Sequence, residues 1–146
     1  MSDNQTQTPS VVRGQCLCGQ VAAEVSVPFN RFFQCYCNRC RKKSGGAFAA
    51  LLFTSAESLK WLKGEDLVKR FDLPEAEVFS TAFCSNCGSP VPFLSRRPGV
   101  LSVPAGFLDN DPMIRPEANI FTEETVCWFE EGQKAPRFDQ YPITPK

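Results

Sequence analysis

The sequence predicts a mainly β fold in a single domain. Twelve prolines and nine glycines interrupt short runs rich in valine and phenylalanine, a pattern typical of many short strands joined by turns. The 146 residues are enough for one hydrophobic core but too few for two. We therefore expect one domain over residues 11–146, preceded by a disordered tail over residues 1–10.

Short apolar runs bounded by turn residues place the expected strands at 19–27, 47–53, 68–73, 78–83, 92–94, 101–105, 120–121 and 126–129. One short helix is expected near residues 56–63. Thr54 and Glu57 have the spacing of a capping box, Leu59 and Leu62 give an apolar side, and Gly64 can end the helix. Three prolines after residue 132 predict an extended strap.

Composition excludes several classes of protein. Sixteen basic and sixteen acidic residues cancel, so the surplus of cations with which proteins neutralise nucleic-acid phosphates is missing. The longest apolar run, residues 47–53, is far below the roughly 20 residues of a membrane-spanning helix. The first ten residues are polar and unlike a signal peptide. We expect a cytoplasmic protein that binds neither nucleic acid nor membranes.

The chain has no histidine. Catalytic systems of the Ser-His-Asp and Cys-His types are therefore excluded, and imidazole is not available as a proton shuttle. Any metal must be bound by thiolates or carboxylates.

The cysteines give the strongest indication of function. Seven of the eight lie in tight C-x-C or C-x-x-C groups: Cys16, Cys18, Cys35, Cys37, Cys40, Cys84 and Cys87. Such close neighbours are poor partners for disulfides but can bind one metal together. Zinc is the expected metal because tetrahedral thiolate sites suit it, and an iron–sulfur cluster is the main alternative.

Seven thiolates divide into four and three. Two pairs, each followed by glycine, can close a structural site: Cys16, Cys18, Cys84 and Cys87. The remaining Cys35, Cys37 and Cys40 would leave an open coordination position, as catalytic zinc sites do. We expect two zinc ions per chain. The isolated Cys127, in an apolar run, is expected to be a buried and inert thiol, with a fourth-ligand or reactive role as the alternative.

A basic run, Arg41-Lys42-Lys43-Ser44, adjoins the three-cysteine group. It is either a solvated loop or a binding site for an anionic ligand of the metal. Arg41, Lys42 and Ser44 are the candidate substrate-binding residues.

Four ordered motifs resemble one known family. They are G-x-C-x-C-G at 14–19, C-x-C-x-x-C-R-K-x-S-G at 35–45, F-C-x-x-C-G at 83–88 and A-G-x-L-D at 105–109. Together they resemble the glutathione-dependent formaldehyde-activating enzyme family, also called the GFA or CENP-V domain family, over nearly the whole chain. Many members have histidine at the positions of Tyr36 and Asn119, neither of which is an expected ligand.

The resemblance implies an Mss4-like fold of packed antiparallel sheets with zinc knuckles. It also implies a structural zinc on the four-cysteine group and a second zinc on Cys35, Cys37 and Cys40. The implied activity is of the carbon–sulfur lyase type, condensing glutathione with formaldehyde to S-hydroxymethylglutathione. A non-catalytic module that binds a small thiol or a protein, and a purely structural zinc protein, are the alternatives. A homodimer is also left open.

Overall fold

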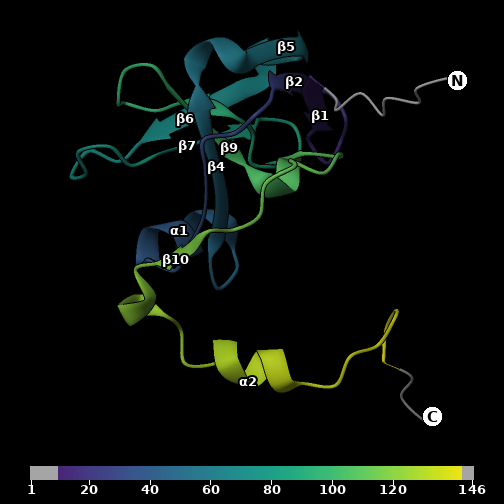
Figure 1. Ribbon diagram of the computed structural model, residues 1–146, viewed down its shortest axis with the longest axis vertical. Helices are drawn as coiled ribbons and strands as arrows, with labels where there is room; N and C mark the ends of the chain where they lie inside the picture. Colours follow the sequence, from purple (N-terminus) through teal and green to yellow (C-terminus); the bar gives the residue numbers. More distant parts are fainter. Residues whose placement is uncertain (1–9, 143–146) are drawn as a thin grey trace, which may run out of the picture.

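The computed structural model describes residues 10–142. Within this range the chain forms ten short strands in three sheets and two short α-helices (Figure 1). Every strand pairing is antiparallel except one. The predicted mainly β class with antiparallel sheets and little helix is therefore confirmed. The expected disordered tail lies almost wholly outside the described residues.

The largest sheet has the strand order β10-β3-β4-β9-β8. Its strands are β10 (Ala118–Ile120), β3 (Arg31–Cys35), β4 (Ala49–Ser55), β9 (Val100–Pro104) and β8 (Phe93–Leu94). The parallel pairing is that of β10 with β3. Leu52 on the central strand and Leu101 on β9 are fully buried in one hydrophobic cluster, so this sheet supports the main core.

Two smaller sheets complete the body. One has the order β1-β2-β5, formed by β1 (Val11–Gln15), β2 (Ala22–Ser26) and β5 (Leu59–Lys63). The other is a two-stranded pair of β6 (Val68–Asp72) and β7 (Ser80–Cys84). A second buried cluster joins them and includes Val21, Ala82 and Val91. Four 3-10 turns follow strands of these sheets. They are η1 (Ala56–Ser58), η2 (Glu65–Leu67), η3 (Ala105–Phe107) and η4 (Thr122–Glu124).

The helix predicted at 56–63 is wrong. The segment is η1 followed by β5, which pairs with β2. Leu59 and Trp61 alternate inward along this strand, whereas Leu62 is 44% exposed. Thr54 does not cap a helix because it is buried in β4, where its hydroxyl donates to the carbonyl of Pro28. Sheet pairing has overridden the local helix pattern.

The real helix, α1 (Asn38–Ser44), was missed. Its N-cap is Cys37, whose sulfur accepts from the backbone N–H of Cys40, and its C-cap is Gly45 in the left-handed conformation with φ of 73°. Helix-ending glycine after a basic turn is a sequence signal for this boundary. The strands β1 and β3 were also missed.

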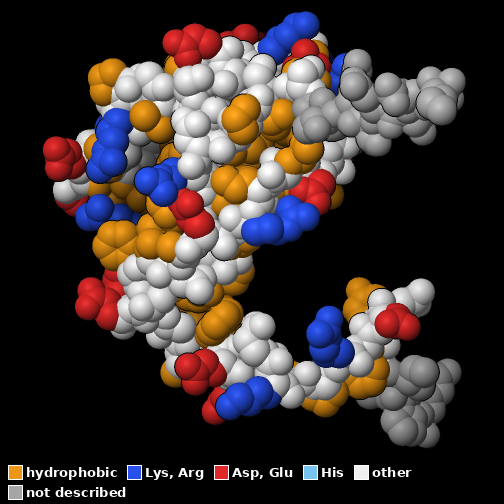
Figure 2. All heavy atoms as spheres, in the orientation of Figure 1, with side chains coloured by type: hydrophobic (Ala, Val, Ile, Leu, Met, Phe, Trp, Pro, Cys, Tyr) orange, Lys and Arg blue, Asp and Glu red, His pale blue; other side chains and the backbone are white. Residues whose placement is uncertain are grey.

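The C-terminal part of the described chain leaves the body as an arm, residues 121–142, which carries α2 (Phe129–Lys134) (Figure 1). Figure 2 shows open space between the arm and the body. The strand expected at 126–129 is wrong, since these residues form a turn and the start of α2. Cys127 is exposed, not buried as expected. The extended strap expected after residue 132 instead begins within α2. Its last proline, Pro145, lies outside the described residues.

Over residues 10–142, no helix has the length and apolar character needed to cross a membrane.

Candidate metal centres

The first cysteine group joins the smallest sheet to the β1–β2 turn. Cys16 follows β1, Cys18 lies in the next turn, Cys84 ends β7 and Cys87 lies in the turn after it. All four sulfurs lie within 4.8 Å of one another. The Sγ atoms of Cys16 and Cys18 are 3.5 Å apart, and those of Cys18 and Cys84 are 3.9 Å apart. The group thus connects segments that are 66 residues apart.

Local turn chemistry positions these sulfurs. Gly19 and Gly88, which follow the two pairs, have φ of 77° and 78°, a region that favours glycine. The N–H of Gly88 donates to the carbonyl of Cys84 at 2.7 Å, and the N–H of Val21 donates to the sulfur of Cys16 at 3.2 Å. The first turn therefore directs a backbone donor at a sulfur, and the second is closed by a backbone hydrogen bond.

Hydrogen bonds also favour ionisation in this group. The backbone N–H groups of Cys18 and Ser89 lower the pKa of Cys87 to about 6. Cys16 and Cys84 are buried in the cluster shared by the two smaller sheets. A metal bound here would therefore join two sheets through the core, as a structural site does.

The second group lies at the C-terminal end of β3, an interior strand of the largest sheet. Cys35 ends β3, Cys37 caps α1, and Cys40 lies within α1. Their sulfurs lie within 4.8 Å of one another, and those of Cys35 and Cys37 are 3.5 Å apart. Among residues 10–142 the group includes no fourth cysteine and no carboxylate, so Cys127 does not complete it.

The electrostatics of the three sulfurs differ. Burial raises the pKa of Cys40 strongly and that of Cys35 as well. Burial also acts on Cys37, but the hydrogen bonds from the backbone of Cys40 and from the thiol of Cys35 outweigh it and lower the pKa of Cys37. Three adjacent thiolates repel one another, so a bound cation would be needed to keep all three ionised.

The geometry of both groups is consistent with zinc. Zinc–sulfur bonds of about 2.3 Å in a tetrahedron separate sulfurs by about 3.8 Å, close to the observed separations of 3.5 and 3.9 Å. A disulfide needs about 2 Å, and all eight cysteines are free. One group offers four protein ligands and the other offers three.

The residues of the basic run that follows the three-cysteine group all lie on α1, but their side chains have different surroundings. Arg41 donates to the side chain of Asn38 at 3.4 Å. Ser44 accepts from the N–H of Gly46 and donates to the carbonyl of Phe48, so it serves the turn after the helix. Lys42 lines a groove described below. Of the three predicted substrate-binding residues, only Lys42 lines it.

Lys43, which was not selected as a site residue, has the most distinctive environment. Its ammonium lies over the rings of Phe79 and Phe93, 5.5 and 5.1 Å from their centroids. Burial lowers the pKa of Lys43, and the charges of Cys40, Cys35 and Cys37 act in the opposite direction. Nothing in the sequence pattern favoured Lys43 within the basic run. On a helix, neighbouring side chains point about 100° apart, so helical periodicity could have shown that the residues of this run face different surroundings.

A groove of about 470 Å³ lies between α1 and the β6–β7 pair. It is lined by Asn38, Arg39, Lys42, Lys43, Phe71, Leu73, Glu75, Phe79 and Thr81. On the side of the body where these elements lie, Figure 2 shows basic side chains beside hydrophobic ones. Phe79 also packs against the buried cluster of Cys35, Cys40, Ala49 and Leu51, so the groove adjoins the cluster that contains two of the three cysteines. A larger hollow lies near Met113 and Arg115, and no cysteine lines either the groove or this hollow.

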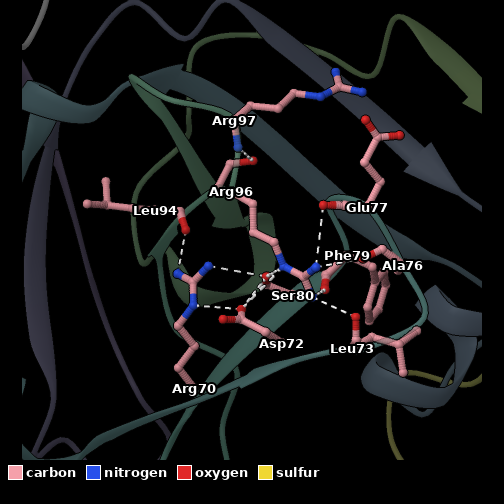
Figure 3. A network of polar contacts seen from close by, with 11 residues as sticks. Arg70, Asp72, Leu73, Ala76, Glu77, Phe79, Ser80, Leu94, Arg96 and Arg97 are labelled. Atoms are coloured by element: carbon pink, nitrogen blue, oxygen red, sulfur yellow. Dashed lines mark hydrogen bonds and ion pairs between the residues drawn. The ribbon is translucent and has the colours of Figure 1, made fainter.

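A polar network holds one wall of this groove (Figure 3). The guanidinium of Arg96 donates to the carbonyls of Leu73, Ala76 and Phe79 at 2.7, 2.6 and 2.9 Å. Asp72 accepts from the hydroxyl of Ser80 at 2.5 Å. The hydrogen bonds of Arg96 thereby stabilise the loop between β6 and β7.

Tyr36 and Asn119, which stand where many members of the resembled family have histidine, face each other. The hydroxyl of buried Tyr36 donates to the amide oxygen of Asn119 at 3.4 Å. The ring of Tyr36 also contacts those of Phe48 and Phe129 on the arm, with centroids 5.2 and 5.3 Å away.

The fold and the site define a class of protein: a small β protein with one four-cysteine and one three-cysteine group, both able to hold a metal ion. The chain belongs to the glutathione-dependent formaldehyde-activating enzyme family, whose model matches residues 11–124. The expected family resemblance is thus confirmed. A solved structure of a Rhodobacter sphaeroides protein is similar, with a TM-score of 0.55 and 22% identity, covering 73% of this chain and 97% of that one. This likeness concerns the fold alone. No curated protein matches the chain.

Proposed function

We propose that the chain is a zinc-dependent enzyme of the carbon–sulfur lyase type that forms and cleaves a thiol adduct. Glutathione and formaldehyde are the first reactants to test, because they are named in the description of the family. In the forward direction the thiol sulfur bonds to the carbonyl carbon. The C=O π electrons move to oxygen, which receives a proton, while the thiol loses one. The product is S-hydroxymethylglutathione.

One observation carries the proposal: the three-cysteine group offers three protein ligands where the other group offers four. Structural zinc sites normally have four protein ligands, and catalytic ones have three. The group lies at the end of β3 beside the groove, and two of its three sulfurs, those of Cys35 and Cys40, belong to buried residues. We infer two zinc ions per chain, one in each group.

The residues have distinct roles in this proposal. Cys35, Cys37 and Cys40 hold the metal, and the N–H of Cys40 steadies the sulfur of Cys37 at 3.4 Å. A zinc ion there would supply a position for the substrate thiol and lower the pKa of that thiol. Arg41 and Lys42 on α1 would attract the carboxylates of a glutathione-like ligand. The proposal needs no histidine.

The test is exchange of ¹³C-formaldehyde with its glutathione adduct, followed by NMR magnetisation transfer. This adduct also forms without a catalyst, so the measured quantity is acceleration over the buffer rate. We expect the zinc-loaded protein to accelerate exchange, and Cys37→Ser to abolish the acceleration. Zinc sulfate at the same concentration is the control for free metal.

Absence of acceleration in a protein that holds two zinc ions would overturn the enzymatic proposal for this pair of reactants. If glutathione nevertheless binds that protein, the non-catalytic thiol-binding module becomes the better description.

A further inference from the structure

The groove beside the three-cysteine group has two chemically different walls. Three cationic side chains from α1 line it, Arg39, Lys42 and Lys43, and the opposite wall is mainly apolar. The lining includes one acidic side chain, Glu75. The groove therefore has two more positive than negative charges. A ligand that fits it must be anionic and have a stem able to lie against aromatic rings.

None of the four charged residues that line this groove forms an ion pair among the described residues. For exposed Arg39 and Lys42 this is ordinary. Lys43 differs because its side chain is half-buried, and the groups facing its ammonium are two aromatic rings. Aromatic faces attract a cation but leave its hydrogen-bond donors unused. Removing a charge from water is costly without a partner, so Lys43 is available for an anion.

Phe79 links this lysine to the candidate metal centre. The ring of Phe79 lies under the ammonium of Lys43 and also packs against the buried cluster that includes Cys35 and Cys40. A ligand whose sulfur reaches that group would therefore pass along Phe79 and bring its stem into the groove. Lys43 is not one of the candidate metal ligands, so a substitution there can alter ligand preference without removing a metal ligand.

We propose that the groove between α1 and the β6–β7 pair binds the stem of an extended peptidic thiol, and that Lys43 determines specificity by binding a carboxylate of that stem. This inference rests on the proposed function for the identity of the site, but not on turnover. It predicts that thiols with carboxylates bind more tightly than neutral thiols of similar length.

S-methylglutathione is a suitable probe because its sulfur is blocked while both carboxylates remain. Its binding therefore measures the groove alone. NMR titration of the zinc-loaded protein should shift the backbone amides of α1 and of residues 79–81. Lys43→Met should weaken binding about tenfold or more, since hydrogen bonds to charged groups are among the stronger ones. Lys43→Arg should retain most of the affinity.

Two controls distinguish the loss of the Lys43 charge from the effects of removing any lysine and of removing the ligand's carboxylates. Lys63→Met removes an exposed lysine of β5 outside the groove and should leave the affinity unchanged. The dimethyl ester of S-methylglutathione lacks the carboxylates, so it should bind weakly and equally to the original chain and to Lys43→Met. Thermal unfolding of each variant verifies the fold.

The inference is overturned if S-methylglutathione shifts no amides in the groove, or if Lys43→Met binds it as tightly as the original chain does. Neither result depends on formaldehyde exchange. Groove binding without exchange would contradict only the enzymatic proposal, whereas exchange without groove binding would contradict only this one.

Discussion

Arg96 donates a hydrogen bond to the carbonyl oxygen of Phe79 at 2.9 Å. The same guanidinium bonds the carbonyls of Leu73 and Ala76 (Figure 3). These carbonyls belong to the loop between β6 and β7, which carries part of the groove wall. A single side chain thus bonds three carbonyls of one loop, in addition to the backbone N–H groups that the carbonyls of Phe79 and Leu73 accept. It helps to hold the segment that carries the ring of Phe79.

Arg96→Lys should therefore loosen the loop. Lysine cannot reproduce the planar fork that reaches several carbonyls at once, so about two hydrogen bonds are lost. We expect the free energy of unfolding to fall by about 1–3 kcal/mol. Affinity for S-methylglutathione should fall as well, because Phe79 is no longer fixed. Urea unfolding and the NMR titration measure the two effects.

Arg97→Lys is the matched control for this prediction. Arg97 is the exposed neighbour, and its backbone N–H, not its guanidinium, bonds the side chain of Ser95. Its replacement should change neither stability nor affinity. Equal effects of the two substitutions would show that Arg96 does not hold the loop.

The two cysteine groups should respond differently to loss of one ligand. Cys84→Ser removes a buried ligand at the junction of two sheets. Structural zinc contributes on the order of 10 kcal/mol to folding, so this variant should unfold or precipitate. Cys37→Ser should stay folded with about one zinc ion per chain. Elemental analysis and far-UV circular dichroism of freshly purified protein distinguish these outcomes.

Equal collapse of both variants would mean that the three-cysteine group is also structural. Iron in place of zinc in the original chain would contradict the choice of metal.

The cysteine groups were accessible from the sequence because ligand spacing is a local property. Two residues in one turn present their thiols together wherever the turn lies. Pairing the first and third turns into one group was an inference from number and matched glycines, and the structure brings those four sulfurs together. Short apolar runs similarly indicated most strands.

Tertiary contacts decided what the sequence could not. The pattern at 56–63 suits a helix, but the segment pairs with β2 as a strand, in which Leu59 and Trp61 are partly buried on one face. Cys127 lies in an apolar run and is nevertheless exposed, because its segment leaves the body after β10. The role of Lys43 depends on Phe79 and Phe93, which are distant in sequence.

Tyr36→Phe tests whether the hydroxyl of Tyr36 contributes to catalysis. The substitution removes one long hydrogen bond to the exposed Asn119 and keeps the ring contacts with Phe48 and Phe129. Stability should fall by about 1 kcal/mol or less. If the hydroxyl only positions the aromatic cluster, formaldehyde exchange should be unchanged. A loss of exchange with unchanged zinc content would identify it as a proton-transfer group.

Gly14→Ala tests why the first cysteine motif begins with glycine. A Cβ at this position would lie 2.3 Å from the carbonyl oxygen of Phe107 and 2.6 Å from the Cδ1 atom of its ring. Real atoms do not approach so closely, and Phe107 is itself buried. The strand β1 must therefore shift away from η3, and Cys16, two residues along, must shift with it.

The expected result is a loss of stability of about 1–3 kcal/mol, the usual cost of overpacking, together with weaker zinc retention by the four-cysteine group. Unfolding in urea measures the first, and competition with a chelator measures the second. Gly106→Ala is the control, since a Cβ there meets no atom within 4 Å. If the Gly14 variant matched the control in both measurements, the close approach of β1 to Phe107 would not position Cys16. The motif glycine would then need an explanation other than space.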